Sequence, residues 1–231
     1  MEGPVSAAGR GATREIHDAY YTPFPCALAI CERLFADRLV LPGSAVLDSS
    51  VGRGAFAAAI AQALDPQVLV GVDLQRQQAL DAVPLDEFIE RDFLNYEPTE
   101  FFDAVITNPP FVQAEEHVRH ALTMLDPDTG VLAFLLRLNF LEGKDRTAGL
   151  WREHPPSVIY VLNRRPSFKK TKKPKLDPLT GSPMLSKRTG KPLMVSSSND
   201  ATAYGVIVWR ACERRSRGLP VTEPVVRWLE W

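Results

Sequence analysis

Short apolar runs alternate with helix-forming segments along most of this chain, and this alternation constrains the fold more than any other feature. The runs that predict strands are 45–47, 68–72, 87–90, 102–107, 130–136, 158–162 and 204–209. Helical patterns at 55–64 and 114–125 separate several of them, which is typical of a parallel, doubly wound sheet. No helical pattern separates the last two runs, so these are expected to pair antiparallel. The sequence therefore predicts an α/β, Rossmann-like sheet of seven strands, mostly parallel, with helices on both faces and an antiparallel strand at the C-terminal end.

The length of the chain bounds its domain organisation. A chain of 231 residues accommodates one sizeable α/β domain. Residues 1–14 are expected to form a flexible N-terminus, because this segment is rich in small residues and glycine. Residues 15–231 are then a single domain. Between its last two strands lies an insertion at about 164–199, rich in Lys, Pro and Ser, and so long a stretch without regular structure is usually functional or disordered.

Positive charge is concentrated in this insertion. From Arg164 to Lys191 there are ten Lys or Arg residues and one acid, Asp177, a local net charge of +9 in a chain whose overall net charge is −1. Such a concentration predicts a docking site for a polyanion. The alternative is a solvated loop that binds no partner.

Cysteine usage and hydropathy indicate the compartment. Cys26, Cys31 and Cys212 match neither a CxxC nor a zinc spacing, so we expect reduced thiols in a cytoplasmic protein. No apolar stretch approaches membrane-spanning length and no signal peptide is recognisable, so no membrane partner is expected. His117 and His120 are spaced HxxH, but their helical face is expected to be exposed, and we predict no metal site.

The strand predicted at 102–107 ends in Asn108-Pro109-Pro110-Phe111. Neither proline can donate a ladder hydrogen bond, so the strand must stop and the chain must turn. The turn places an amide side chain, a stiff carbonyl and an aromatic ring together at the end of a strand. This combination suits an exocyclic NH2 group on a flat base or an amide, because Asn and the carbonyl accept its hydrogens and Phe111 stacks on its plane.

Acids follow the three preceding strands. Asp48 leads into a turn with Gly52 and Gly54, whose missing side chains let the backbone approach a ligand. An acid before this turn favours a ligand with a cationic part over a pyrophosphate. Asp73 follows the second strand, where an acid commonly binds ribose hydroxyls, and Asp92 follows the third, next to Phe93. For each acid alone, the alternative is the N-cap of a helix.

These motifs resemble those of a known family. Together with Tyr20-Tyr21-Thr22-Pro23 near the N-terminus, they are similar to the class I, S-adenosylmethionine-dependent methyltransferases, and specifically to the DNA adenine methyltransferases that act on amino groups. The resemblance extends over roughly 20–209. It is closest to small phage- and prophage-type adenine methylases, a kind also found in restriction-modification systems, which share blocks similar to 141–146, 165–168 and 200–209.

The resemblance implies roles for individual residues. The residues expected to bind S-adenosyl-L-methionine are Tyr21, Thr22, Pro23, Asp48, Gly52 and Gly54 for its methionine part, Asp73 for its ribose, and Asp92 and Phe93 for its adenine. The residues expected to hold the target amino group are Asn108, Pro109, Pro110 and Phe111. Phe168 or Tyr204 either sandwiches the target base with Phe111 or is an ordinary core aromatic.

The resemblance also implies a nucleic-acid substrate. A base inside a duplex cannot reach such a pocket, so the target adenine would be flipped out or single-stranded. The residues expected to contact the nucleic acid are Arg164, Arg165, Phe168, Lys169, Lys170, Lys172, Lys173 and Lys175. Because no recognition domain intervenes, sequence specificity is expected to be low; the alternative is that it lies in the loop that leads to Asn199, or in a partner. The alternatives are methylation of an adenine N6 or guanine N2 in ribosomal RNA, methylation of glutamine N5 in a protein, and a catalytically inactive nucleic-acid-binding subunit.

Overall fold

The computed structural model describes residues 21–168, 172–174, 177, 182–186, 189–196, 202–212 and 223–231. The strands are β1 Ala45–Asp48, β2 Val68–Asp73, β3 Glu87–Glu90, β4 Ala104–Thr107, β5 Val131–Arg137, β6 Val158–Leu162, β7 Lys172–Pro174, β8 Met194–Ser196, β9 Tyr204–Arg210 and β10 Val225–Leu229. The α-helices are α1 Phe24–Ala36, α2 Ala55–Leu64, α3 Ala114–Thr123, α4 Lys144–Ala148 and α5 Leu150–Glu153. Short 3-10 helices are η1 Gln78–Ala82, η2 Phe93–Asn95, η3 Phe111–Gln113 and η4 Leu138–Leu141. The N-terminus expected to be flexible, 1–14, lies outside the described residues.

One sheet organises the main body of the chain, with the strand order β10-β6-β9-β5-β4-β1-β2-β3. All neighbouring strands pair parallel except β9, which is antiparallel to both β5 and β6. The mostly parallel sheet is therefore confirmed, and so is the antiparallel pairing of the runs 158–162 and 204–209. The chain runs outward from β1 through β2 to β3 and then returns to β4 on the other side of β1. The strand order thus reverses between β1 and β4, which is where open α/β sheets bind ligands.

The sheet has eight strands rather than the predicted seven. The additional strand, β10, pairs parallel with β6 along its whole length. A single hydrogen-bonded network holds this edge against α1: Asp37 at the end of α1 accepts from Tyr160 Oη of β6 and pairs with Arg227 of β10. The sequence analysis did not predict this strand, which is held in place by contacts with two distant elements, α1 and β6.

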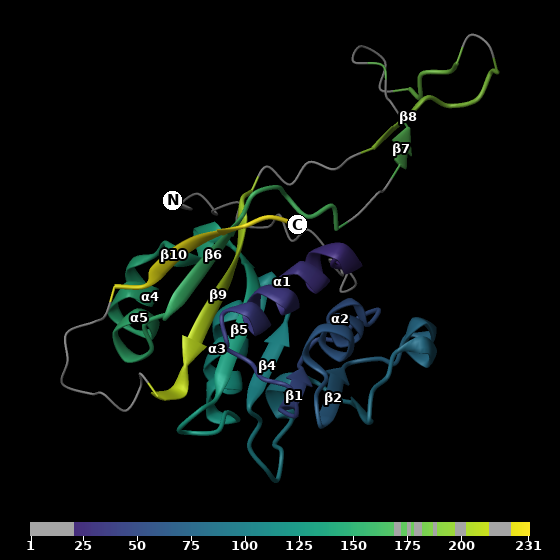
Figure 1. Ribbon diagram of the computed structural model, residues 1–231. Coiled ribbons are helices and arrows are strands. Elements are labelled where there is room, and N and C mark those ends of the chain that lie inside the picture. The colour runs from purple at the N-terminus through teal and green to yellow at the C-terminus, as the bar shows by residue number, and fades with distance from the viewer. Residues whose placement is uncertain are drawn as a thin grey trace, which may run out of the picture.

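Apolar side chains cover both faces of the sheet. Successive strand residues point to opposite sides, so Val46 belongs to the core beneath α1 and α2, whereas Leu47 belongs to the core beneath α3. Figure 1 shows α1 and α2 side by side across one face. The prolines after β4 end that strand as expected, and Pro25 stands in the first turn of α1, where its missing N–H costs no hydrogen bond.

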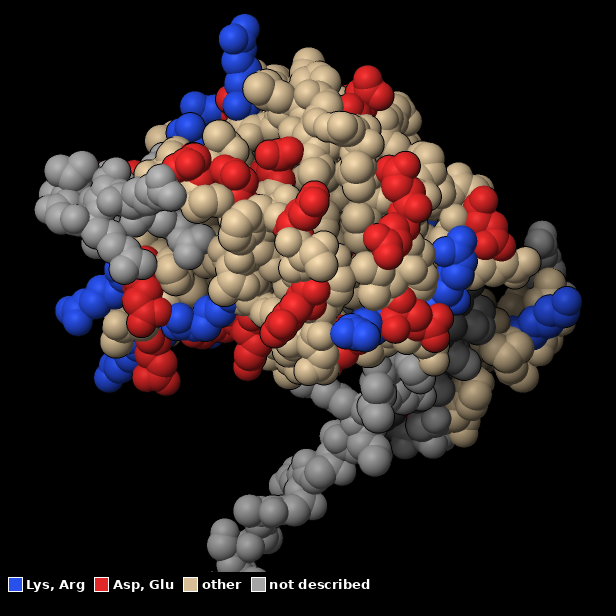
Figure 2. Space-filling view, turned by 90° about the horizontal axis from the view of Figure 1, so that it is seen from below, with Lys and Arg blue, Asp and Glu red and all other residues tan. Residues whose placement is uncertain are grey.

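The two ends of the parallel strands, which form opposite edges of the sheet, differ in charge. Asp65, Asp86, Asp103 and Asp126 lie in the turns that enter β2, β3, β4 and β5. Several of them accept from main-chain N–H groups, as Asp103 does from Ala45 at 2.8 Å. Figure 2 shows acidic side chains spread over the face seen from below. The basic insertion leaves the opposite edge, after β6, and includes the two-stranded sheet β7-β8, which projects away from the main sheet in Figure 1.

Within the described ranges, no helix combines the length and apolar character needed to cross a membrane. Cys26 and Cys31 are buried in α1 and Cys212 is exposed; all three are free. Burial raises the pKa of the Cys26 thiol to about 12, so this side chain acts as part of the core.

Candidate active site

Asp48 is the charged residue at the centre of the strand reversal. It ends β1 and is fully buried. Its Oδ1 accepts from Thr107 Oγ1 of β4 at 2.6 Å and from the Ser50 N–H at 3.3 Å, whereas Oδ2 has no hydrogen-bond partner. Burial raises the pKa of Asp48 to about 7, against the opposing effect of the Thr107 hydrogen bond. A buried carboxylate oxygen without a partner fits the positively charged methionine part of S-adenosyl-L-methionine, since an uncompensated buried charge is costly.

The turn after β1 needs both of its glycines, for different reasons. Gly52 and Gly54 have φ angles of +55° and +82°, in the left-handed region. A Cβ on Gly52 would lie 3.4 Å from the Tyr21 ring, within the candidate site. A Cβ on Gly54 would lie 2.6 Å from Val83 Cγ2 and 2.9 Å from Leu80 Cδ2. The close approach at Gly54 is therefore to these side chains near η1, and Gly52 is the glycine that faces the site.

The acids after β2 and β3 bind the main chain. Asp73 Oδ2 accepts from the Gly52 N–H at 2.7 Å and so joins the end of β2 to the glycine turn. Asp92 caps η2 by accepting from the Leu94 N–H at 3.0 Å, which is the N-cap role considered as the alternative. A carboxylate has lone pairs beyond these bonds, so each acid retains the capacity to accept from a ligand. Phe93 is only 3% exposed.

His117 and His120 border Phe93. The face of α3 that carries them was expected to be exposed, but it is covered. His117 is 4% exposed, and its ring centroid lies 5.1 Å from that of Phe93. His120 packs edge-on against the same ring at 5.0 Å, with Nε2 2.9 Å from the Tyr96 carbonyl oxygen. Burial lowers the pKa of His117 to about 4. The prediction of an exposed face was wrong because the loop after β3 folds over this side of α3. Among the described residues, no group of His, Cys, Asp and Glu is placed to hold a metal ion.

The amide of Asn108 is oriented by a residue from the N-terminal segment. Asn108 Nδ2 donates to Thr22 Oγ1 at 3.1 Å, although the two residues are far apart in sequence. This bond directs the donor end of the amide at Thr22, and Oδ1 becomes the end that accepts. Pro109 is buried, and Pro110 is exposed and precedes η3.

A cavity of about 40 Å³ lies next to Asn108; we call it the first cavity. It is lined by Tyr21, Thr22, Ser50, Val51, Gly52, Arg53, Ala55, Phe56 and Asn108. The Arg53 guanidinium lies over the Tyr21 ring, 4.2 Å from its centroid. The structure therefore brings the predicted Tyr-Thr-Pro segment, the glycine turn and the Asn108 amide to one place. Pro23 adjoins this place as the N-cap of α1, whereas Asp92 and Phe93 lie beyond the ends of β2 and β3.

Phe111 belongs to an aromatic cluster. Its ring centroid lies 6.2 Å from that of Phe168 and 5.8 Å from that of Tyr204, and these two lie 4.9 Å apart. Phe168 and Tyr204 are 7% and 1% exposed, so both are core aromatics in this structure. The Arg137 guanidinium lies over the Phe111 ring, 4.8 Å from its centroid.

A second cavity, of about 210 Å³, lies at the carboxyl end of β5, and Phe111 forms part of its wall. It is lined by Phe111, Ala114, Leu136, Arg137, Asn139, Phe140 and Arg146. The strand-end rule that singled out Asp48 and Asn108 would also have found Arg137, which ends β5, but sequence reasoning stopped at the fourth strand. Nothing in the local sequence indicates that Arg146 lines the same cavity as Arg137.

The residues predicted to contact nucleic acid are only partly described. Arg164 and Arg165 are exposed beyond β6, and the Arg164 guanidinium lies over the Trp231 ring, 4.2 Å from its centroid. Lys172 and Lys173 belong to strand β7. Lys169, Lys170 and Lys175 lie outside the described residues.

The fold resembles those of several solved structures, with which the chain shares little sequence. The methyltransferase subunit of a type I restriction-modification system from Streptococcus thermophilus matches with a TM-score of 0.56 at 18% identity, over 82% of this chain and 44% of that one. A putative class I S-adenosylmethionine-dependent methyltransferase from Listeria monocytogenes matches with a TM-score of 0.55 at 13% identity, over 90% and 65% of the two chains. A putative RNA methyltransferase from Pyrococcus horikoshii matches with a TM-score of 0.51 at 14% identity, over 84% and 87%.

The fold is that of the class I methyltransferases. The chain spans 44% of the first of these proteins and 65% of the second. No family model matches the sequence, and no curated protein matches it.

Proposed function

We propose that this protein transfers a methyl group from S-adenosyl-L-methionine to N6 of an adenine in DNA, and that the adenine is single-stranded or flipped out of the duplex. The observation that carries the proposal is the position of Asn108. Its amide is held by Thr22 at 3.1 Å, beside the first cavity and next to Thr107, which donates to the buried Asp48. The acceptor end of the amide is thus fixed beside the place that suits a cationic cofactor.

Fixed acceptors suit amino-group chemistry. The lone pair of adenine N6 is delocalised into the ring, so N6 is a poor nucleophile. When Asn108 Oδ1 and the Pro109 carbonyl accept its two hydrogens, the nitrogen is favoured in a pyramidal geometry with the lone pair localised. S-adenosyl-L-methionine would be held by Asp48 and the glycine turn, and would supply an electrophilic methyl group on a sulfonium whose departure leaves a neutral thioether; one N6 proton would pass to solvent. The protein's part is orientation and electrostatics.

Charge distribution supports a polyanionic substrate. The basic insertion leaves the edge of the sheet that carries the candidate site, and the turns at the opposite edge carry acids (Figures 1 and 2). A polyanion would be attracted to one edge and repelled from the other. Contacts from Arg164, Arg165 and the lysines of the insertion to phosphates would supply affinity without sequence information. This supports DNA over a protein glutamine as substrate.

The test is the identity of the methylated nucleoside. The purified protein is incubated with methyl-labelled S-adenosyl-L-methionine and, separately, duplex DNA, single-stranded DNA and ribosomal RNA, and the products are digested to nucleosides. We expect N6-methyladenine from DNA, with single-stranded DNA labelled at least as fast as duplex, because it needs no base flipping. Label only in RNA, or only in guanine, would contradict the proposal. Cofactor binding without label in any nucleic acid would indicate a protein substrate or an inactive binding subunit.

A further inference from the structure

The second cavity contains two arginines and is not accounted for by the cofactor. It lies at the ends of β4 and β5, and Phe111, the last residue of the Asn108 tetrapeptide, forms part of its wall. A substrate whose amino group lies at Asn108 therefore has its neighbouring groups within reach of this cavity. No Asp or Glu is among the described residues that line it.

Arg146 is held in place by groups that leave its charge uncompensated. Its Nε donates to the Phe140 carbonyl oxygen at 2.8 Å, its Nη2 donates to the Glu142 carbonyl oxygen, and its guanidinium lies 4.9 Å from the centre of the Phe140 ring. These contacts fix the side chain, but none is with a carboxylate. A guanidinium oriented in this way is well suited to an anion, because it keeps N–H donors available and the cost of ordering it is already met by the fold.

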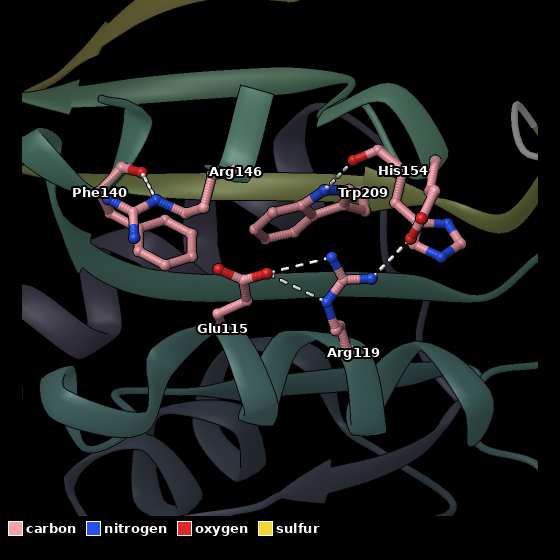
Figure 3. A network of polar contacts seen from close by, with 7 residues as sticks. Glu115, Arg119, Phe140, Arg146, His154 and Trp209 are labelled. Carbon is pink, nitrogen blue, oxygen red and sulfur yellow. Dashed lines mark hydrogen bonds and ion pairs between the residues drawn. The ribbon is translucent and has the colours of Figure 1, made fainter. Parts of the chain in front are cut away.

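Arg119 lies in the same region and has the opposite character. Figure 3 shows it between Glu115 and α5. Its Nε and Nη2 lie 3.1 and 3.0 Å from Glu115 Oε1, and its Nη1 lies 2.6 Å from Glu153 Oε2. Two carboxylates thus compensate this guanidinium, and Glu115, which follows the lining residue Ala114, is already paired. Arg146, by contrast, is a cation without a carboxylate partner in the part of the chain that the structure describes.

Arg137 supplies the second cation of the cavity. Its Nε donates to Tyr204 Oη at 3.3 Å, and its guanidinium lies over the Phe111 ring. It thereby connects the cavity to the ring expected to stack on the target base. Asn139, which is exposed on η4, adds an amide donor to the same lining.

We infer that the second cavity is a phosphate-binding subsite, in which Arg137 and Arg146 hold the phosphodiester next to the target nucleotide and so position its base at Asn108. This inference rests on the proposed function for the identity of the target. The cavity selects phosphate chemistry, which a free nucleotide and a nucleic-acid strand both carry. The strand is favoured because the basic insertion leaves the same edge of the sheet.

The experiment measures binding rather than turnover. A fluorescently labelled single-stranded oligonucleotide contains one adenine, and in matched versions one phosphodiester is replaced by a neutral methylphosphonate, either immediately 5′ or 3′ of the adenine or four nucleotides away. For the unmodified protein we expect replacement at one flanking position to weaken binding about tenfold, the scale of losing hydrogen bonds to a charged group. Replacement at the distant position should have little effect.

Variants assign the effect to the cavity. In Arg146→Gln the same flanking replacement should no longer matter, because the arginine and the phosphate act as a pair. The slope of log affinity against log salt should fall by about 0.7 for one lost contact to a single strand. Arg146→Lys keeps the charge and should recover part of the affinity. Arg152→Gln is the control, since this exposed arginine on α5 does not line the cavity, and thermal unfolding together with cofactor binding verifies that each variant folds.

The outcomes separate this inference from the proposed function. Equal sensitivity to the flanking replacement in the unmodified protein and in Arg146→Gln would overturn the subsite, even if the protein methylates DNA adenine. Conversely, a protein that methylates no nucleic acid but binds 2′-deoxyadenosine 5′-monophosphate better than deoxyadenosine, in an Arg146-dependent manner, would uphold the subsite and refute the substrate. That result would also identify the free nucleotide as the source of the phosphate.

Discussion

The ends of β1 and β5, each beside one of the two cavities, differ in charge, and the Asn108 tetrapeptide lies between the cavities. The first cavity adjoins the turn that follows the buried acid Asp48, which ends β1. The second is lined by Arg137 and Arg146, at the end of β5 and beyond it. A cationic cofactor and an anionic substrate would each be favoured on one side and disfavoured on the other. The strand order separates the end of β1 from the end of β5. It would thereby keep the binding sites of two oppositely charged reactants apart.

The largest effect is expected at the residue between the cavities. Under the proposed function, Asn108→Ala removes an acceptor for the reacting nitrogen, and losing one preorganised hydrogen-bonding group typically lowers a rate by about 100- to 1000-fold. Cofactor affinity should change much less, because the buried acid Asp48 beside the first cavity is intact. Rates from methyl transfer and affinities from calorimetry provide the comparison.

Gln62→Ala, which shortens an exposed amide side chain on α2, is the matched control. It should keep full activity. If Asn108→Ala also kept full activity, Asn108 would not hold the target amino group. The reacting nitrogen would then have to bind elsewhere in the site.

The next largest effect concerns the turn that forms the first cavity. Gly54→Ala places a Cβ 2.6 Å from Val83 Cγ2 at a φ of +82°, so strain and overpacking should together lower the free energy of unfolding by about 2–4 kcal/mol. Gly43→Ala is the control with similar backbone strain, since Gly43 has a φ of +80° and no atom within 4 Å of the added Cβ. It should lose only about 1–2 kcal/mol. Urea unfolding measures both, and equal losses would show that the packing at Gly54 contributes nothing.

The sequence indicates the acid side of the site better than the arginine side, for a physical reason. Asp48 and Asn108 follow apolar strands directly, so local patterning places them at the edge of the sheet. Arg146 reaches the second cavity through η4 and α4, whose course depends on tertiary contacts. The eighth strand and the burial of His117 were missed for the same reason: Asp37, which pairs with Arg227 of β10, and Phe93, which packs against His117, are distant in sequence.

A smaller effect should distinguish the charge of Asp48 from the shape of the first cavity. Because the pKa of Asp48 is raised to about 7, the carboxylate is ionised above this pH and neutral below it. Affinity for S-adenosyl-L-methionine should therefore rise as the pH increases from 6 to 8. Asp48→Asn should bind about tenfold more weakly at pH 8, as for a lost charged hydrogen bond, and should lose this pH dependence. Asp81→Asn, in an exposed ion pair, is the control, and an unchanged pH profile in Asp48→Asn would assign the titration to another group.

The smallest effect is expected in the protein without cofactor, where two buried groups oppose each other. The folded-state pKa of Asp48 is raised, so its contribution to stability is present at low pH and is lost as the pH rises from about 4 to 7. The folded-state pKa of His117 is lowered from 6.5 to about 4, so its contribution is lost as the pH falls through this range. The two slopes have opposite signs in the same window and should largely cancel.

Removing either group reveals the effect of the other on the pH dependence of stability. Between pH 4.5 and 6.5 the urea midpoint of Asp48→Asn should fall on acidification more steeply than that of the unmodified protein, because the His117 term then acts alone. For His117→Gln the midpoint should fall less steeply or rise. The remaining carboxylates titrate alike in all three proteins, so only the differences between the curves matter. Three parallel curves would mean that neither group is buried in its stated ionisation state. Asp48 would then not supply the negative charge beside the first cavity.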